Sequence, residues 1–475
     1  MNEAELLEEE ADRILVTEDV LFFLINLLET HHKGDLEGKL LLILSGLSSG
    51  FQDKRKTIHV ITVGGSGKGK SHLQEAVSYL FERVDNINST SAKALLYRTK
   101  AEKEEDKLIN KGIIKLDESE DSEVLKALER ALTDDTLTPI KHISVDKDKK
   151  STSFIIREIN AIWKNQVSTP EDEQTLNRYL IYNVDESEEQ DQAVFKRIIQ
   201  EYCYNDFIDT NSRDFKLAKI ITNKIEERIN IIIPYGDFLE SSDINNRRST
   251  PKFLKLLELI TYAYRFRRPK LIDKNNNTFI FSTLIDFKIA SLLWRKLNRY
   301  EITHLNQKEL LLFNIIPKGE KNAVDRQELA NKLNVHTDTV SNWIGKLIDN
   351  GLINYKEERI ITKKYYYWTT KEYEGLRITL NTNKLTLEAL RTRISRTTKK
   401  YNIIIDNSEL NQILNEIMAI NIKSSKIVVL LENNEKQSLE ALEVKNRDFV
   451  ESRSLSESNQ YNKEELKRMK EIENW

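Results

Sequence analysis

The chain has 475 residues, of which 39% are hydrophobic and 31% charged, and its formal net charge is -3. This length predicts two or three domains, and the longest apolar runs, 20–28 and 40–47, are far shorter than the ~20 residues that span a membrane. Cys203 is the only cysteine, which excludes an internal disulfide and a zinc site with several thiolate ligands. We therefore expect a folded cytoplasmic protein without a membrane segment.

The first strong pattern follows an N-terminal helical stretch of about fifty residues. The β-branched run "TIHVITV" at 57–63 predicts a strand, and Leu73, Val77 and Leu80 recur at helical spacing in "HLQEAVSYLF". Between them lies "GGSGKGKS". A strand, a glycine-rich loop and a helix in this order form the context of a phosphate-binding loop.

This loop matches the Walker A pattern for a nucleoside triphosphate. Glycines let backbone N–H groups converge on phosphates, Lys70 can reach the β- and γ-phosphates, and the Ser71 hydroxyl can bind Mg²⁺. ATP and Mg²⁺ are therefore the expected cofactors. The candidate nucleotide-binding residues of the loop are Gly64, Gly65, Ser66, Gly67, Lys68, Gly69, Lys70 and Ser71.

Two strands followed by Asp-Glu compete for the second magnesium-side carboxylate. "GIIKLDES" carries Asp117 and Glu118, and "LIYNVDES" carries Asp185 and Glu186. The first pair follows the loop by about fifty residues, a usual separation for neighbouring core strands. We assign Asp117 to Mg²⁺ and Glu118 to the attacking water as general base.

The remaining patterns complete an α/β core and a second unit. Further strands are expected at 139–145, 152–158, 161–167 and 179–184, with helices between and after them. From 305 to 370, two short amphipathic helices and two strands predict a winged helix-turn-helix. The expected divisions are an N-terminal helical segment 1–50, an α/β subdomain 51–235, a helical lid 236–304, the winged unit 305–370, a basic helical extension 371–433 and a charged flexible tail 434–475.

The order of these pieces resembles the AAA+ core of MCM-type helicases, particularly the MCM-like helicases of plasmids, viruses and integrated elements. "KTIHVITVGGSGKGKSHL" is similar to the MCM phosphate-loop strand, and "HKGDLEGKLLLILSGLSSG" to the helix before it. The resemblance covers roughly residues 12 to 270. It implies an α/β P-loop AAA+ ATPase core, with a mixed or parallel sheet, flanking helices and a helical lid.

The resemblance also implies residue roles. Asn165, with Gln166 second, would be the sensor-1 residue, and Arg178 an arginine finger that acts on ATP in a neighbouring subunit. In this interpretation the strand before Asp185 follows the finger and binds no magnesium. Either Arg248 or its neighbour Arg247 would be the sensor-2 residue.

Basic residues supply the candidate DNA contacts. A presensor hairpin through "PIKHISVDKDKKSTSFIIRE" would place lysines in the channel of a ring, where they could follow single-stranded DNA. In the winged unit, polar residues of the recognition helix and cations of the wing could contact duplex DNA. The candidate DNA-binding residues are Lys147, Lys149, Lys150, Thr337, Ser341, Asn342, Lys346, Lys363 and Lys364.

The departures from the family are also informative. Only about fifty residues precede the core, where MCM proteins carry a large collar, and the lone cysteine excludes a multi-cysteine zinc module. The leading hypothesis is an ATP-driven, hexameric DNA helicase or translocase of a mobile or viral replicon. An AAA+ initiator that binds origin duplex and a promoter-reading P-loop regulator remain as alternatives.

Overall fold

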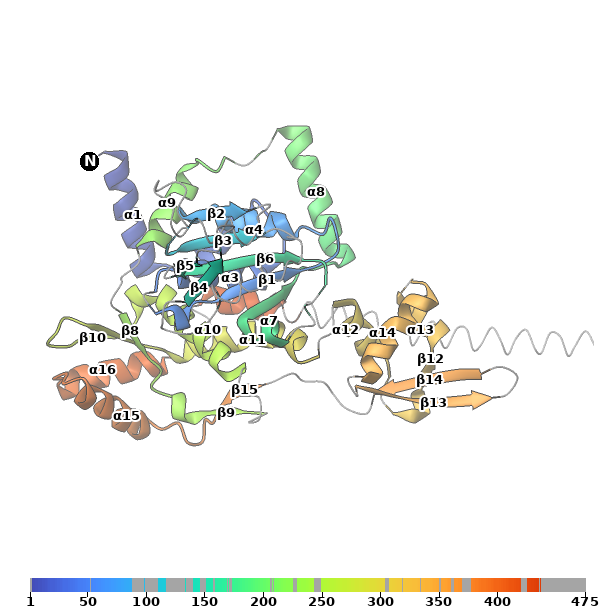
Figure 1. The fold of residues 1–475 in the computed structure, drawn as a ribbon. Coiled ribbons are helices and arrows are strands. Elements are labelled where there is room, and N and C mark those ends of the chain that lie inside the picture. Colours follow the sequence, from blue (N-terminus) through green and yellow to red (C-terminus); the bar gives the residue numbers. More distant parts are fainter. Residues whose placement is uncertain are drawn as a thin grey trace, which may run out of the picture. The chain divides into compact units, whose positions relative to one another are not determined.

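Figure 1 shows the chain in a computed structural model, in which two compact units are distinguished. Unit 1 comprises Met1–His304 and Glu374–Leu431, and unit 2 comprises Leu305–Tyr373 and Glu432–Trp475. The structure describes residues 2–51, 53–87, 98, 110–116, 133, 140–145, 151–156, 159–168, 170, 173–205, 207, 209–224, 229–242, 249–303, 307–317, 319–333, 335–349, 352–359, 363–369, 377–419, 425–434 and 436.

The centre of unit 1 is a five-stranded parallel sheet in the order β2-β3-β6-β1-β7. Its strands are β1 (His59–Val63), β2 (Val84–Ile87), β3 (Gly112–Leu116), β6 (Asn160–Gln166) and β7 (Tyr179–Asn183). Every residue of β1 and β7 is buried. This explains their nearly continuous apolar runs, because a parallel sheet is covered on both faces. Four of the five strands are those expected, and β2 is additional.

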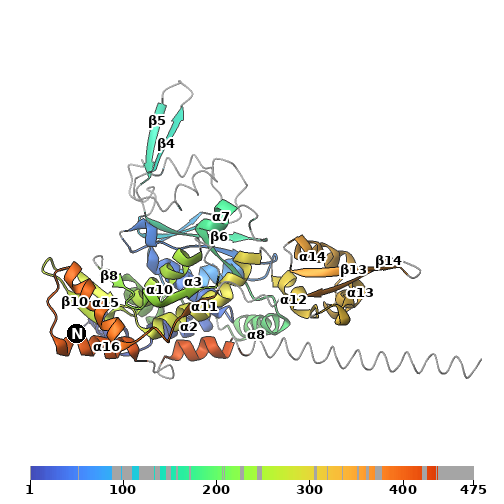
Figure 2. The same cartoon turned by 90° about the horizontal axis from the view of Figure 1, so that it is seen from below.

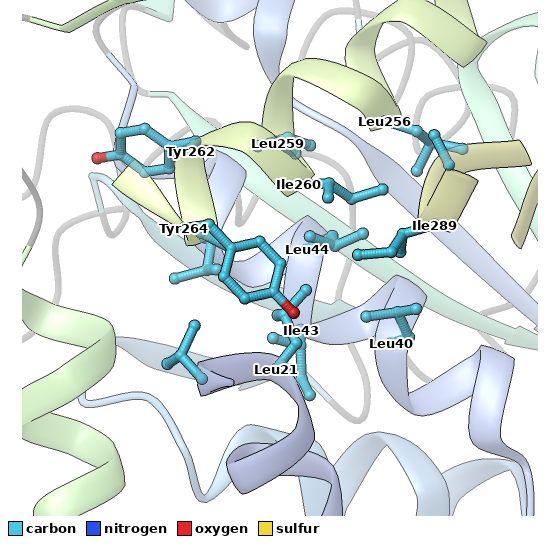
Figure 3. Close-up of a cluster of buried hydrophobic side chains, with 14 of the residues drawn as sticks. Leu21, Leu40, Ile43, Leu44, Leu256, Leu259, Ile260, Tyr262, Tyr264 and Ile289 are labelled. Carbon is cyan, nitrogen blue, oxygen red and sulfur yellow. The ribbon is translucent and has the colours of Figure 1, made fainter. Parts of the chain in front are cut away.

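Three N-terminal helices, α1 (Glu3–Thr17), α2 (Val20–Glu29) and α3 (Leu36–Ser48), form much of the core. All 13 residues of α3 are buried. Figure 3 shows apolar side chains of α3 meeting those of α10 (Ser249–Ala263) and α11 (Leu284–Thr303). Gly38 lets α3 approach the sheet closely, since a Cβ at this position would collide with the ring of Tyr182. Thus the "KLLLILSGL" run is a central helix.

Further helices precede or follow the strands of the central sheet along the chain. Helix α4 (Lys70–Ser78) follows β1 directly, and α7 (Glu173–Arg178) ends immediately before β7. Helices α8 (Glu188–Tyr204) and α9 (Arg213–Asn223) follow β7. The described residues of this unit include the 3₁₀ turns η1 (Lys54–Lys56), η3 (Gly236–Phe238) and η4 (Arg265–Arg267). Strands β1 and β7 are parallel neighbours. The turn that leads from β1 into α4 and the turn that leads from β7 into α8 therefore lie at the same edge of the sheet.

Unit 1 also contains three small sheets. Strands β8 (Ile229–Ile232), β10 (Lys270–Ile272) and β11 (Thr278–Phe281) form one, in the order β10-β11-β8. Strand β9 (Leu239–Ser241) pairs with β15 (Ile378–Leu380), and β4 (Ile140–Val145) pairs antiparallel with β5 (Ser151–Ile156). The two strands expected to form a hairpin, at 139–145 and 152–158, therefore pair with each other. The region expected to be a helical lid also carries strands, which are too short to show a clear alternation in sequence.

The segment Glu374–Leu431, which follows the first part of unit 2, belongs to unit 1. Helices α15 (Leu387–Lys400) and α16 (Asn407–Met418) lie beside the β10-β11-β8 sheet, where the Phe279 and Tyr401 rings pack 4.5 Å apart (Figures 1 and 2). A last helical stretch, 426–434, buries Ile427. Its start is tied to the N-terminal helices, since Asp19 Oδ2 accepts from the Ile427 N–H at 3.1 Å. The C-terminal extension is thus part of the core.

Unit 2 is small and built around a three-stranded antiparallel sheet in the order β12-β14-β13. Its elements are α12 (Gln307–Ile315), η5 (Glu320–Asn322), β12 (Val324–Asp325), α13 (Arg326–Leu333), α14 (Thr337–Asp349), β13 (Ile353–Arg359) and β14 (Lys363–Thr369). Leu329, Val340 and Leu347 are fully buried and hold α13 and α14 together. Both helices and both long strands agree with the expected pattern.

Candidate nucleotide-binding site

The glycine loop lies between the end of β1 and the start of α4 (Figure 1). Gly67 and Gly69 adopt φ of 74° and 86°, a left-handed conformation that favours glycine because a Cβ would be strained. The Gly64 N–H donates to the Gln166 carbonyl oxygen at 3.2 Å, which fixes the start of the loop against β6. The N-cap residue of α4 is Gly69, which has no side chain to cap the helix. The first N–H groups of α4 and the positive end of its dipole face the loop.

Two lysines of the loop are held in different ways. The Lys70 ammonium donates to the carbonyl oxygens of Gly64 and Gly65 at 2.7 and 2.9 Å, and the residue is only 8% exposed. Lys68 instead makes an ion pair of 2.7 Å with Asp191 in the first turn of α8. Lys70 therefore points into the loop, whereas Lys68 joins the loop to α8.

Glu186 is a site residue that the sequence reasoning did not assign. It follows β7, and its Oε1 accepts a hydrogen bond of 2.6 Å from the Gly65 N–H. A carboxylate on this N–H shows that the loop accepts an anion, as a phosphate-binding loop must. The "VDES" motif was the signal, but only the pairing of β7 with β1 brings it to the loop.

The expected sensor residue Asn165 lies on β6, opposite Thr62 of β1. Its Nδ2 donates to the Ser71 hydroxyl at 3.3 Å, so Asn165 and Ser71 form part of one polar cluster. Asp117 and Glu118 lie outside the described residues, as do Arg247 and Arg248. The last residue of β3, Leu116, ends on the same edge of the sheet as the loop because all five strands are parallel.

Arg178 lies at the other end of the sheet. It precedes Tyr179, which pairs with His59 at the start of β1, whereas Asn183 pairs with Val63 at the loop end. A strand of this length spans about 13–16 Å. Burial, followed by the charges of Lys255, Lys54 and Arg178, lowers the pKa of His59 to about 3. Arg178 thus belongs to a group of cations at the edge of the sheet that lies opposite the glycine loop of the same chain.

A partly buried polar network lies next to the loop. His32 contacts His72 of α4 through their Nδ1 atoms at 2.9 Å, and its Nε2 lies 2.8 Å from Asp35. Asp35 Oδ1 accepts from the Tyr182 hydroxyl and from the Asp185 N–H, each at 2.8 Å. Burial and then the neighbouring His32 lower the pKa of His72. The network links the first turn of α4 to the end of β7, and so holds Glu186 near Gly65.

The candidate DNA-binding residues fall in two places. Lys147, Lys149 and Lys150 lie outside the described residues, between the paired strands β4 and β5. In unit 2, Thr337 begins α14, and the exposed Asn342 lies further along the same helix.

Several of the unit 2 candidates have partners within the unit. The Ser341 hydroxyl donates to the Thr337 carbonyl oxygen and accepts from Arg326, each at 2.8 Å. Lys346 pairs with the buried Glu309 at 3.0 Å, and Lys364 lies 3.7 Å from Asp325. Lys363 starts β14 opposite Arg359. Lys346 and Lys364 remain 53% and 59% exposed, so both cations face solvent.

The sheet, the loop and the positively charged helix start define a P-loop domain of the kind that binds and hydrolyses nucleoside triphosphates. Residues 5–228 match the family model described as the MTBMA_p00010 P-loop domain. This match begins in α1 and extends to the residue before β8, so it includes the loop and the whole central sheet. No curated protein matches the chain. None of the helices among the described residues is long and apolar enough to cross a membrane.

Proposed function

We propose that the protein is an ATP-driven DNA helicase or translocase of MCM-like type that works as a ring of identical subunits. The observation that carries the proposal is the separation of Lys70 and Arg178, which lie at opposite ends of the neighbouring strands β1 and β7. An arginine at that distance cannot reach the nucleotide of its own chain. A second copy packed head to tail would bring its Arg178 to the loop of the first.

The residues around the loop fit ATP and Mg²⁺. The loop N–H groups and the start of α4 would bind phosphates. The Lys70 ammonium, which donates to the Gly64 and Gly65 carbonyl oxygens, would contact the β- and γ-phosphates. Bound Mg²⁺ would neutralise charge on the transferred phosphoryl group. Among the described residues no cluster of three His, Cys, Asp or Glu could hold a metal. The proposed ligands of the magnesium ion are the phosphates, Ser71 and Asp117.

Catalysis would depend on three further side chains. Glu118 would orient and deprotonate the attacking water, and Asn165 would hold that water or the γ-phosphate beside Ser71. Arg178 from the next subunit would stabilise charge on the γ-phosphoryl group, for which a planar guanidinium is well suited. Sensor-2 contact with the phosphates is proposed for Arg248 in the same way.

The DNA-binding part of the proposal has separate support. Unit 2 has the order of elements that a winged helix-turn-helix requires, with α14 as recognition helix and β13 and β14 as the wing. The β4–β5 hairpin has Lys147, Lys149 and Lys150 between its strands, where a ring channel would offer them to the backbone of single-stranded DNA. The phosphate contacts of the wing would come from Lys363 and Lys364.

A strand-displacement assay on a forked duplex tests the proposal. The wild-type protein is expected to unwind the fork with ATP and Mg²⁺, and both Lys70→Ala and Lys147→Ala are expected to lose unwinding. Lys70→Ala should also lose hydrolysis, whereas Lys147→Ala should keep its basal hydrolysis and lose stimulation by single-stranded DNA. A wild-type protein that binds duplex tightly and never unwinds it would contradict the helicase and support the initiator.

A further inference from the structure

Helix α8 exposes its apolar side chains. None of its 17 residues is buried. The large apolar residues recur at helical spacing and form one stripe, with exposed fractions that run from 37% to 75%. We call this the α8 stripe. Its members are Val194, Phe195, Ile198, Ile199 and Tyr202.

The polar side of α8 faces the core instead. The Gln190 side chain donates to the Lys33 carbonyl oxygen, while Arg197 and Glu201 pair at 3.1 Å and are only 12% and 19% exposed. The charge of Arg197 contributes to lowering the pKa of both His31 and His72, after the larger effect of burial. Specific polar contacts therefore orient α8 with its apolar stripe outward, which is the reverse of an ordinary surface helix.

We propose that the α8 stripe is the surface on which a second copy of this chain docks, and this inference rests on the ring proposed above. The start of α8 touches the nucleotide loop through the ion pair between Asp191 and Lys68. In Figure 1, α8 lies beyond the carboxyl ends of β1 and β6. A copy that covers the stripe is therefore next to the loop, where the site needs an arginine from outside.

Charge determines which face of the second copy fits. The first turn of α8 is acidic, with Glu188 and Glu189 beside Asp191, which pairs with Lys68. At the opposite edge of the sheet, where Arg178 immediately precedes β7, the positive charges of Lys255, Lys54 and Arg178 all act on His59. The acidic edge of one copy therefore attracts the basic edge of another. Two copies that met through their α8 edges would instead bring like charges together, which disfavours that arrangement. Such a contact joins different surfaces of the two copies, so it repeats and can close into a ring.

A crosslinking experiment on the full chain separates the possible arrangements. Cys203, the only cysteine, is exposed on α8, and Arg55, which is 55% exposed, lies in η1 just before β1. With a bifunctional maleimide and a non-hydrolysable ATP analogue, Arg55→Cys is expected to give a ladder of dimers, trimers and larger species. The unaltered chain, with Cys203 alone, should give little product. Efficient dimers from Cys203 alone, with no ladder from Arg55→Cys, would overturn the proposal because they indicate α8 packing on α8.

A second experiment tests the stripe itself. The double variant Phe195→Ser, Ile198→Ser should weaken nucleotide-dependent self-association roughly tenfold or more, as measured by sedimentation, because it removes central apolar contacts. The matched control Ile404→Ser alters a residue that is 84% exposed in unit 1 but far along the chain from α8. Binding of a fluorescent ATP analogue to monomers should be unchanged in both variants, which verifies folding.

The outcomes separate this inference from the function it rests on. If the wild type assembles and hydrolyses ATP, and the stripe variant assembles equally well, the docking surface is wrong while the ring stands. If the wild type remains monomeric at every concentration with nucleotide bound, both the docking surface and the proposed ring are wrong. Loss of assembly in the stripe variant alone supports the inference.

Discussion

Helices α3 and α8 are both rich in apolar residues, yet they have opposite surroundings. All 13 residues of α3 are buried, whereas none of the 17 residues of α8 is. Helix α3 lies between the sheet and helices α10 and α11 (Figure 3), while α8 turns its polar side to the core through Gln190 and Arg197. The difference teaches that α3 stabilises the fold, whereas the apolar residues of α8 are available to a partner.

Truncation of one apolar residue in each helix should give the largest contrast. Leu44→Ala in α3 removes a side chain that is 0% exposed, so we expect a loss of about 2–5 kcal/mol in the free energy of unfolding. Ile198→Ala in α8 removes a side chain that is 45% exposed, so its effect should stay within about 0.5 kcal/mol. Urea denaturation measures both, and equal losses would show that α8 is packed like α3.

The second largest effect that we expect is a pH dependence of the free energy of unfolding, caused by His31 in the core near α8. The His31 ring stacks on Tyr79 and meets Phe215 edge to face. Neither of its ring nitrogens has a hydrogen-bond partner among the described residues, and burial is the main cause that lowers its pKa to about 4. The unfolded chain therefore binds more protons between about pH 6.5 and 4, so the stability contributed by neutral His31 is lost as the pH falls through this window.

The variant His31→Phe should flatten the stability profile in that window. It keeps an aromatic ring between Tyr79 and Phe215 but cannot be protonated. Denaturation at several pH values between 7 and 4 measures the slope. Because His59 also has a lowered pKa, of about 3, part of the slope should remain. An unchanged slope would show that His31 is not buried in its neutral form.

A smaller effect is expected where the chain enters α8. A phosphate bound in the loop competes with the Glu186 carboxylate for the Gly65 N–H. Glu186→Gln removes the negative charge, so nucleotide should bind several-fold more tightly, a gain of about 1 kcal/mol. Glu189→Gln is the control, since this residue is exposed in the first turn of α8. Fluorescence titration compares the two, and equal changes would indicate only a general charge effect.

The smallest effect concerns the polar side of α8. Removal of the Arg197 charge in Arg197→Gln should raise the pKa of His31 and His72 toward the ordinary range, because this cation helps to lower both. Burial remains in place, so the change should be only a fraction of the total shift. NMR titration of the histidine rings measures it. Unchanged pKa values in both rings would show that α8 does not lie against this part of the core.

Much of the central fold could be predicted from local patterns, but the environment of α8 could not. The strands β1, β3, β6 and β7 are β-branched runs, and the loop between β1 and α4 has a spacing that only a phosphate-binding loop requires. Strands β2 and β8 to β11 are three or four residues long, too short for a periodic signal.

The missed site residue has a related physical cause. Glu186 is separated from Gly65 by 121 residues, and only the pairing of β7 with β1 brings them together. A sequence pattern can identify an Asp-Glu pair after a strand, but it does not specify which strands are neighbours. Likewise, the helical spacing of the α8 stripe indicates an amphipathic helix without showing which side faces the core.

The central claim is that one nucleotide site is shared by two copies of the chain, with Lys70 from one and Arg178 from the next. Mixing two inactive variants tests it most directly. Lys70→Ala and Arg178→Ala should each lose ATP hydrolysis, because every site then lacks one of the two residues. The account predicts that the mixture recovers part of the activity, since an Arg178→Ala copy has an intact loop that a Lys70→Ala neighbour can complete. A mixture no more active than the two variants measured separately would contradict the shared site.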